Sequence, residues 1–488
     1  MKKKFVSNLL LVLVLNIIIK PIYILGIDAE VLKITEQNDP GSYGIYFSLL
    51  SLSFVFNILL DMGVNTFNTR NIAQNNKLFY KYFSKLFNLK IFLGILYLLT
   101  IISVGKFLNY SNHNIKLLIL IGFNQILIAF ILFLRSNLSA LLRFKEDSII
   151  SVADRTILIL FCGYFLWAKT TQNIITIEFF ILSQTLAYLI TLIFALIFLP
   201  SKSFVLKIKW NLKFNFIIVK KSMPYALLIF LMSIYYYSDV VMIEKLRGNV
   251  EASAYAHGYR FFMAFNMIGV LFAGLLLPTF SKMIKEKSNI SRITWLSFKL
   301  MFLCAIIIGV SVWTNKLEII KWRYNLSGLS LLHSSETFGW LIISFIAVSL
   351  NYIFGTLLTA NGKLKPINIL AAIAVIINIS MNLILIPKFG STGAAFSSMI
   401  TQFFTLFFQI YFCYKIFPNN VRIRSYIKLL LFIILYIIII FRVNYNINYD
   451  WYLKLSIYLT IGVVNGFLLN IINIKDFKLF VNSAKMKN

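Results

Sequence analysis

Long apolar segments, separated by short polar ones, run along almost the whole chain. A helix that crosses a bilayer needs about 20 mostly apolar residues. The pattern therefore predicts an all-α polytopic membrane protein with about 14 transmembrane helices. The predicted spans are 5–27, 41–61, 82–105, 115–137, 150–168, 176–199, 217–238, 254–280, 293–314, 337–360, 366–387, 391–414, 429–441 and 455–473. The thirteenth is short as written, and we expect it to begin nearer Tyr426.

The N-terminal segment resembles a secretory signal only superficially. Residues 1–4 are basic and 5–19 are apolar, as in a signal peptide. However, the apolar stretch resumes after Lys20-Pro21, and no cleavage site with small residues follows. We therefore expect the first transmembrane helix here. The connections between spans are short, so we expect one helical bundle without an extramembrane domain; the longest are 28–40, 62–81, 200–216 and 315–336.

The composition also indicates a membrane protein, and this affects how the net charge is interpreted. Of the 488 residues, 59% are hydrophobic and 13% are charged, whereas a soluble protein has about a quarter charged residues. This excludes a soluble enzyme, a disordered tail and a secreted disulfide scaffold. The formal net charge of +30 would indicate nucleic acid binding in a soluble protein. In a membrane protein, basic loops on one membrane face explain it better, so we expect no nucleic acid partner.

The distribution of basic residues predicts the orientation in the membrane. If the N-terminus and every second loop lie inside, the inside segments hold 29 of the 47 basic residues, the outside 12 and the spans six. Basic residues favour the cytoplasmic side, so both termini are expected there. After the acids are subtracted, the inside carries +24, the outside +1 and the spans +5. Most of the charge therefore sets orientation, and the +5 within the spans indicates an anionic ligand.

Spans 1–6 and 7–12 resemble two copies of one unit. A small residue, a tyrosine and another small residue stand at the outer start of the second and eighth spans, at 42–44 and 254–256. Lys90 and Lys299 lie at similar depths in the third span of each half. Paired halves of this kind are typical of transporters. We expect an N-terminal lobe at 1–200, a cytoplasmic linker at 201–216, a C-terminal lobe at 217–415, and an appendage with a basic tail at 416–488.

Six cations lie within the predicted spans, against one acid, Asp154. Each such charge costs at least about 2.5–3.5 kcal/mol in lipid and usually faces a cavity or a partner. A cavity rich in cations favours an anion such as a diphosphate, whose oxygens accept charge-assisted hydrogen bonds. The candidate substrate-binding residues are Lys20, Lys90, Lys299, Arg260, Arg135 and Arg155, and the possible ion-coupling or ion-pair acids are Asp61, Asp154 and Asp239.

These candidates differ in depth. Arg135 and Arg155 lie near the cytoplasmic ends of their spans, where they can reach the interface, and Arg155 can pair with an adjacent charge. Lys20, Lys90 and Lys299 lie deeper and favour a cavity. For Arg260, pairing with Asp239 and contact with a ligand remain open. Amides within the spans either meet a hydroxyl-rich ligand or bond neighbouring helices; they are Asn124, Gln125, Gln184, Asn351, Asn378, Asn382 and Gln402.

Other chemistry has little support in the sequence. Three histidines, His113, His257 and His333, are scattered along the chain, and the three cysteines all lie in apolar segments. No nucleotide-binding lysine motif of the Walker type is present. We therefore expect no metal and no cofactor.

Several short motifs recur in a specific order along the chain. In the first half they stand at 41–48, 60–63 (Leu-Asp-Met-Gly) and 70–73 (Arg-Asn-Ile-Ala). In the second half they stand at 222–226, 239–243, 254–260, 277–281, 358–363 and 382–387. Their order and spacing resemble bacterial polysaccharide (O-antigen) flippases of the multidrug/oligosaccharidyl-lipid/polysaccharide exporter superfamily. The resemblance covers most of residues 1–415.

The resemblance implies a MATE-like fold of two lobes in the bacterial inner membrane. It also implies flipping of an undecaprenyl-diphosphate-linked oligosaccharide to the periplasmic leaflet by alternating access, and possible contact with polysaccharide polymerase or assembly proteins. A multidrug exporter of the same fold is the nearest alternative, although it would favour an acidic cavity. A membrane glycan polymerase or ligase is less favoured, because such enzymes use a sizeable periplasmic loop. We therefore expect a transporter and not an enzyme.

Overall fold

The computed structural model describes residues 15–65, 68–69, 72, 78–141, 143–168, 175–199, 212–362, 364–417, 423–446 and 449–471. Within these residues the chain is helical and contains no strand, which confirms the predicted fold class. The helices form two compact units, residues 1–256 and 257–488, and each unit is described by itself.

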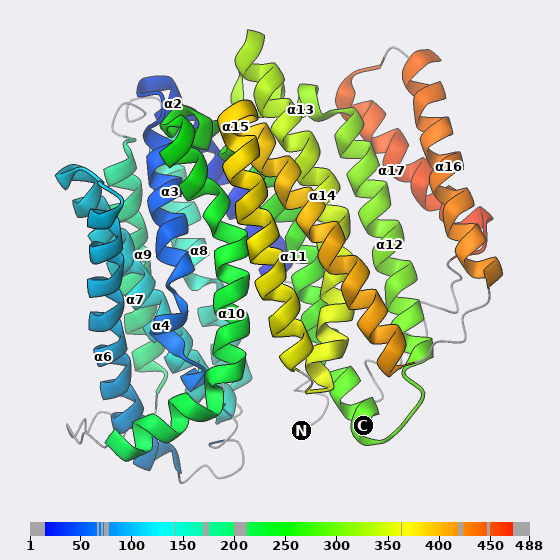
Figure 1. Cartoon of the computed structure of the whole chain (residues 1–488). Coiled ribbons are helices and arrows are strands. Elements are labelled where there is room, and N and C mark those ends of the chain that lie inside the picture. The colour runs from blue at the N-terminus through cyan, green and yellow to red at the C-terminus, as the bar shows by residue number, and fades with distance from the viewer. Residues whose placement is uncertain are drawn as a thin grey trace. The chain divides into compact units, whose positions relative to one another are not determined.

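The first unit is built around α7 (Asn112–Ala140), which packs mainly on four other helices and also contacts α4 (Ile58–Asp61). The four are α3 (Ser42–Val55), α6 (Leu78–Phe107), α8 (Phe144–Trp167) and α9 (Ile177–Ile197). Figure 1 shows them side by side. The rest of the unit consists of η1 (Ile22–Asp28), α2 (Ala29–Asn38), α4 (Ile58–Asp61), α10 (Leu212–Arg247) and the first turns of α11 (Asn249–Lys285).

Aromatic packing fills the core between α6 and α7. Phe83 stacks on Phe133 with ring centroids 5.6 Å apart, and Phe79 lies 5.3 Å from Phe83. Neither helix contains an internal proline. The start of α7 is fixed by the Ser111 hydroxyl, which accepts a hydrogen bond from the backbone N–H of Asn114 at 3.3 Å, a typical N-cap.

The second unit is centred on α14 (Gly328–Ala360), which packs on α15 (Leu364–Ile416), α12 (Ser291–Thr314) and α13 (Lys316–Tyr324). The C-terminal pair α16 (Ile423–Asn446) and α17 (Trp451–Leu468) packs on α12. A buried tyrosine fixes this contact: the Tyr436 hydroxyl lies 2.8 Å from that of Ser311 and donates to the Tyr458 carbonyl at 3.1 Å.

Among the described residues, eleven helices are long and apolar enough to cross a membrane. This number is lower than fourteen for three reasons. The predicted spans 366–387 and 391–414 are both present as the two helical parts of α15, which meet at the non-helical residue Gly390 (φ 60°, ψ −136°) and share one label. The predicted span 41–61 breaks into α3 and α4 at residues 56–57. The predicted span 5–27 begins outside the described residues.

Two of the predicted connections are largely helical. The segment 28–40 is mostly helix α2, because the helix continues past Asp28 with buried Val31, Leu32 and Ile34. The segment 315–336 contains α13 and the first turns of α14. The sequence interpretation placed the ends of both spans at charged residues. A helix can nevertheless continue past a charged residue when that residue has a partner.

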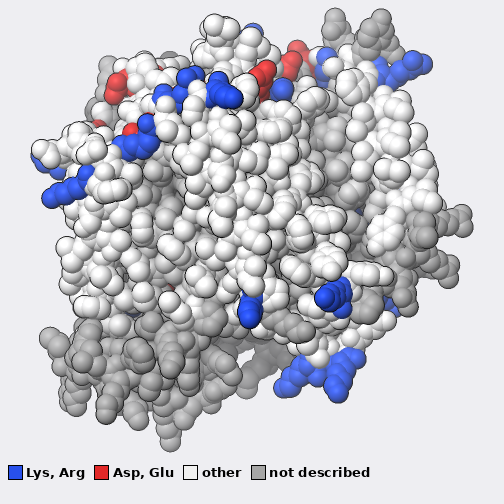
Figure 2. All heavy atoms as spheres, in the orientation of Figure 1, with Lys and Arg blue, Asp and Glu red and all other residues white. Residues whose placement is uncertain are grey.

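The helix faces away from the core are apolar. Large hydrophobic side chains such as Leu99, Leu160, Ile376 and Phe407 are more than half exposed. On the face drawn in Figure 2, charged atoms gather along the upper rim and at a few places lower down, and a broad uncharged zone lies between. An apolar exterior of this extent suits contact with lipid.

Candidate functional site

The first described helix changes its hydrogen-bonding pattern directly after Lys20. Pro21 precedes the π-helical stretch η1, and proline removes a backbone donor that an α-helix would use. Short π-helical stretches occur frequently at functional sites. η1 packs on α8, which carries Asp154 and Arg155. The local backbone change therefore lies next to two of the candidate residues.

Lys20 is half-buried and lies in the electrostatic field of Arg155, Asp154 and Arg135. Its side chain makes no hydrogen bond or ion pair with any residue that the structure describes. Lys20 therefore differs from Lys90 and Arg135, each of which is paired with an acid among the described residues.

Arg155 lies between two buried tyrosines. Its guanidinium carbon is 4.4 Å from the centroid of the Tyr23 ring and 5.9 Å from that of Tyr188. It also donates to the Tyr188 hydroxyl at 3.2 Å, and its Nε lies 3.6 Å from Asp154 Oδ2. This contact is the pairing with an adjacent charge that the sequence left open for Arg155. These contacts hold the guanidinium in one orientation beside Lys20.

Arg135 has a partner that the sequence interpretation did not assign. Its Nε lies 2.7 Å from Asp147 Oδ1, and the side chains of both residues are largely buried. Asp147 stands in the first turn of α8, just before the predicted span 150–168. Arg135 and Asp147 are 12 residues apart, on either side of a predicted connection. This spacing could have indicated the pair, because two consecutive antiparallel helices bring such positions together. The Arg135 charge is therefore compensated within the protein.

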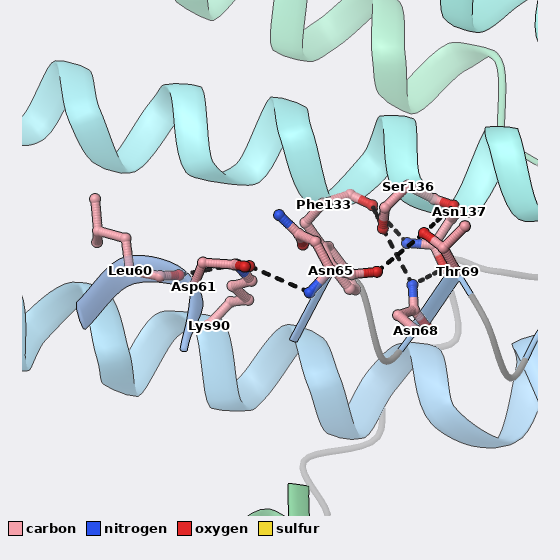
Figure 3. A network of polar contacts seen from close by, with 9 residues as sticks. All are labelled: Leu60, Asp61, Asn65, Asn68, Thr69, Lys90, Phe133, Ser136 and Asn137. Carbon is pink, nitrogen blue, oxygen red and sulfur yellow. Dashed lines mark hydrogen bonds and ion pairs between the residues drawn. The ribbon is translucent and has the colours of Figure 1, made fainter. Parts of the chain in front are cut away.

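Lys90 forms a buried ion pair with Asp61, seen in Figure 3. The Lys90 ammonium donates to Asp61 Oδ1 at 2.6 Å and to the Leu60 carbonyl at 2.8 Å. The Lys90 side chain is 1% exposed, whereas that of Asp61 is 32% exposed. Asp61 ends α4, where Met62 adopts a left-handed conformation (φ 42°). The pair thus joins the break after α4 to α6.

Amides and hydroxyls extend this network toward α7 (Figure 3). The Asn68 amide donates to Ser136 Oγ at 3.3 Å and to Asn137 Oδ1 at 2.9 Å. The Thr69 hydroxyl donates to the Asn65 carbonyl at 2.9 Å and to the Ser136 carbonyl at 3.3 Å. The segment after α4 is therefore fixed to α7 by polar contacts, next to the Lys90–Asp61 pair.

In the second unit, Lys299 lies on α12 and donates to the Ile471 carbonyl at 2.9 Å. Arg260 lies on α11 with 2% of its surface exposed, and its Nη1 lies 3.5 Å from the Met263 sulfur. The six predicted cations are thus divided. Lys20, Arg135, Arg155 and Lys90 belong to the first unit, and Arg260 and Lys299 belong to the second.

The acids of the first unit include one that the sequence interpretation placed in a loop. Asp28 ends η1, is buried, and accepts a hydrogen bond from the Tyr43 hydroxyl at 2.6 Å. Asp239 is also buried and accepts one from the Tyr255 hydroxyl at 3.2 Å. The apolar residues after Asp28 stand at helical spacing, and this pattern could have indicated that Asp28 is buried. Each of these carboxylates is therefore matched by a tyrosine.

Most of the candidate amides bond neighbouring helices. Asn124 donates to the Ile181 carbonyl at 3.1 Å, and Gln184 donates to the Tyr46 hydroxyl at 2.9 Å. In the second unit the amide of Asn351 donates to the side-chain oxygen of Gln402 at 3.0 Å, and that of Asn382 to Asn378 at 3.2 Å. Within the described part of the chain, no group of three or more His, Cys, Asp or Glu side chains is placed to hold a metal ion.

The two-unit helical bundle is shared with solved transporters. A structure of the lipid II flippase MurJ in its inward closed conformation has a TM-score of 0.71 at 16% identity, covering 93% of this chain and 97% of that chain. An inward-facing multidrug resistance MATE family transporter of the MOP superfamily has a TM-score of 0.64 at 10% identity, covering 80% and 95%. A MOP superfamily transporter from Pyrococcus furiosus, described as having a binding pocket of reverse polarity, has 0.59 at 12%, covering 84% and 95%.

At these identities the likeness establishes the fold, which is that of a MOP-type transporter. Comparison of the sequence with protein families identifies a family as well as a fold. Residues 39–284, just over half of the chain, match the family of polysaccharide biosynthesis proteins. The chain belongs to this family, which confirms the family resemblance predicted from its motifs. No match is found among curated proteins.

Proposed function

We propose that this protein is a flippase that moves an undecaprenyl-diphosphate-linked oligosaccharide from the cytoplasmic to the periplasmic leaflet of the bacterial inner membrane. Membership of a polysaccharide biosynthesis family and the MOP-type transporter fold support a lipid-linked saccharide as cargo. The observation that carries the proposal is the ammonium of Lys20, which pairs with none of the described residues and lies in the field of the fixed guanidinium of Arg155. Polymerase or assembly proteins are proposed partners that take over the flipped product.

The charges beside η1 suit a diphosphate. Lys20, Arg155 and Asp154 together carry one more positive charge than negative. A lysine is a mobile point charge, whereas an arginine held by aromatic rings offers donors in a fixed fork. In this proposal Arg155 orients the diphosphate, and Lys20 gains the partner that it lacks. The lipid tail stays in the membrane while the head group moves by alternating access.

The decisive experiment is a flipping assay in vesicles with a fluorescent lipid-diphosphate-sugar. We expect Lys20→Gln to lower the flipping rate at least tenfold at equal protein amount, and Lys20→Arg to keep most of it. Lys116→Gln removes an exposed lysine of the predicted outer side and serves as the matched control. Flipping by Lys20→Gln at the wild-type rate would overturn the role of Lys20.

The same vesicles separate the flippase from a multidrug exporter, which is the fold's other established use among the matched structures. A flippase moves the lipid-linked sugar and leaves a cationic dye where it is. Transport of the dye without transport of the lipid would favour the exporter.

We also propose the orientation with both termini cytoplasmic. Single cysteines at Lys116 and Lys287, both exposed, are introduced into a variant that lacks the three native cysteines. In intact cells a membrane-impermeant maleimide should label position 116 and not position 287. The reverse labelling would invert the topology.

A further inference from the structure

The first unit contains a polar cavity that the proposed function does not use. It has a volume of about 620 Å³, within the range of about 300–1,000 Å³ that small-molecule sites occupy. It lies where the end of α2 and the starts of α3, α7 and α9 meet. All four segments belong to connections that the basic-residue pattern predicts outside. The side chains that matter here are those of Asn38, Asp39, Ser42, His113, Asn114 and Glu178.

Local hydrogen bonds hold the walls of this cavity in place. The Glu36 carboxylate accepts the backbone N–H groups of Gly41 at 2.9 Å and Tyr43 at 2.8 Å, which fixes the turn between α2 and α3. Gly41 has φ +92°, a conformation that L side chains rarely adopt. On the opposite wall, His113 Nε2 lies 3.3 Å from Glu178 Oε1 and joins the start of α7 to the start of α9. The cavity is therefore preformed in the protein.

The chemistry of the lining selects among ligands. None of the described residues that line the cavity is Lys or Arg, and two are the carboxylates Asp39 and Glu178. A diphosphate would be repelled by these carboxylates. The amides and hydroxyl offer donors and acceptors, and the carboxylates accept. A sugar hydroxyl is both donor and acceptor, so an uncharged saccharide matches this set.

We propose that this outer cavity binds uncharged sugar residues of the cargo after its head group has reached the periplasmic side. The inference rests on the proposed function for the identity of the cargo, but it concerns a different set of residues. The Lys20–Arg155 pair recognises the diphosphate, and the outer cavity recognises the glycan. A site of this kind would hold the glycan outside while the diphosphate leaves its cations.

The test measures binding of the phosphate-free repeat-unit oligosaccharide, released by mild acid from the lipid-linked intermediates of the source cells, to the full chain in nanodiscs by calorimetry. We expect Asp39→Asn with Glu178→Gln to raise its Kd at least tenfold, and Asn114→Trp, which fills the cavity, to abolish binding. Asp450→Asn, an exposed acid on α17's N-terminal side, should leave the Kd unchanged. Thermal unfolding confirms that each variant is folded.

The outcomes keep the two proposals apart. Lys20→Gln should bind the free oligosaccharide as the wild type does and fail to flip. If the cavity variants bind it as tightly as the wild type does, the saccharide site is wrong whatever the flipping result. Displacement of the oligosaccharide by inorganic diphosphate, or by tetraphenylphosphonium, would make the cavity an anion site or a cation site and overturn the assignment. Oligosaccharide binding without flipping would refute the proposed function alone.

Discussion

Lys90 and Lys299 occupy matching positions in the third spans of the two halves, yet they meet different partners. Lys90 on α6 bonds a carboxylate and a carbonyl at the break after α4. Lys299 on α12 bonds the carbonyl of Ile471, just past α17 in the C-terminal appendage. The predicted repeat places a lysine at a similar depth in each half, and the surrounding helices give the two lysines different contacts. Equivalence in sequence therefore does not imply a shared ligand.

The difference extends to the buried polar groups around them. In the first unit, cations meet acids: Lys90 with Asp61 and Arg135 with Asp147. In the second unit, the contacts are mainly between neutral groups, such as the Asn382–Asn378 pair and the Thr337–Ser391 hydroxyls, which lie 3.1 Å apart. Charged pairs are far more sensitive to loss of one member than neutral pairs are. The comparison can be tested by removing one partner at a time.

Asp61→Asn should have the largest effect. It leaves the Lys90 ammonium buried with the Leu60 carbonyl as its remaining partner among the contacts described, and loss of one member of a buried pair costs about 3–5 kcal/mol. Because Asp61 is 32% exposed, we expect the lower end of this range or less. Thermal unfolding in detergent measures the loss. Asp61→Asn with Lys90→Met should recover most of it; an unchanged unfolding temperature in the single variant would show that the pair is not stabilising.

Lys299→Met should have a smaller and more local effect. It removes a charged hydrogen bond to the Ile471 carbonyl, and such bonds contribute about 1.5–3 kcal/mol. Because Ile471 follows α17, the expected result is loosening of the appendage with the rest of the second unit intact. Limited proteolysis after residue 468 measures this. Cleavage as slow as in the wild type would mean that the contact does not hold the appendage.

Arg155→Lys should cost about 0.5–2 kcal/mol, the value of a cation–π contact. Lysine keeps the charge near Asp154 but loses the planar contact with Tyr23 and the fork that reaches Tyr188. We expect a modest fall in unfolding temperature and a larger fall in flipping rate. If both fall in proportion, the role of Arg155 is structural, and the orienting role in the proposed mechanism is wrong.

Asn382→Leu should have the smallest effect. Hydrogen bonds between side chains in membrane proteins average about 0.6 kcal/mol, so loss of the Asn382–Asn378 contact should hardly move the unfolding temperature. A double-mutant cycle with Asn378→Leu isolates the interaction. A coupling energy as large as that of the Lys90–Asp61 pair would remove the distinction between the two units.

A polar contact in the first unit joins α10 to the turn between α6 and α7. The Glu244 carboxylate of α10 accepts a hydrogen bond from the Tyr110 hydroxyl at 2.9 Å, and the Lys245 ammonium lies 3.5 Å from the centre of the Tyr110 ring. Burial, together with the Glu244 charge, raises the pKa of Tyr110, so this phenol stays a donor. The repeat predicted α10 at the start of the second lobe, but it packs on α3 in the first unit. The predicted lobes at 1–200 and 217–415 remain a proposal, because residues 201–211 lie outside the described part.

Particular residues mark the limit of sequence reasoning at the site. The sequence identified Lys20, Arg155 and Asp154 as charges within spans, and it indicated that Arg155 can pair with its neighbour. Charges that stand next to each other in an apolar segment can be recognised without knowledge of the fold. It missed Asp28, whose charge was taken as the end of a span, since only the fold brings the Tyr43 hydroxyl to it. It also missed Asp147 as the partner of Arg135. Pairing between helices depends on their rotation and offset, which hydropathy does not encode.

The sequence by itself determined the helical class, the positions of most spans, the family, and the surplus of cations within the membrane. These follow from local chemistry, because lipid accepts only long apolar helices and the membrane face selects basic loops. Tertiary structure alone decided which cations are compensated by acids among the described residues, as Lys90 and Arg135 are. It also decided that Lys90 and Lys299, which the predicted repeat makes equivalent, have unlike contacts. Partners are chosen by helices far apart in the chain, and the free energy of a buried charge depends on those partners.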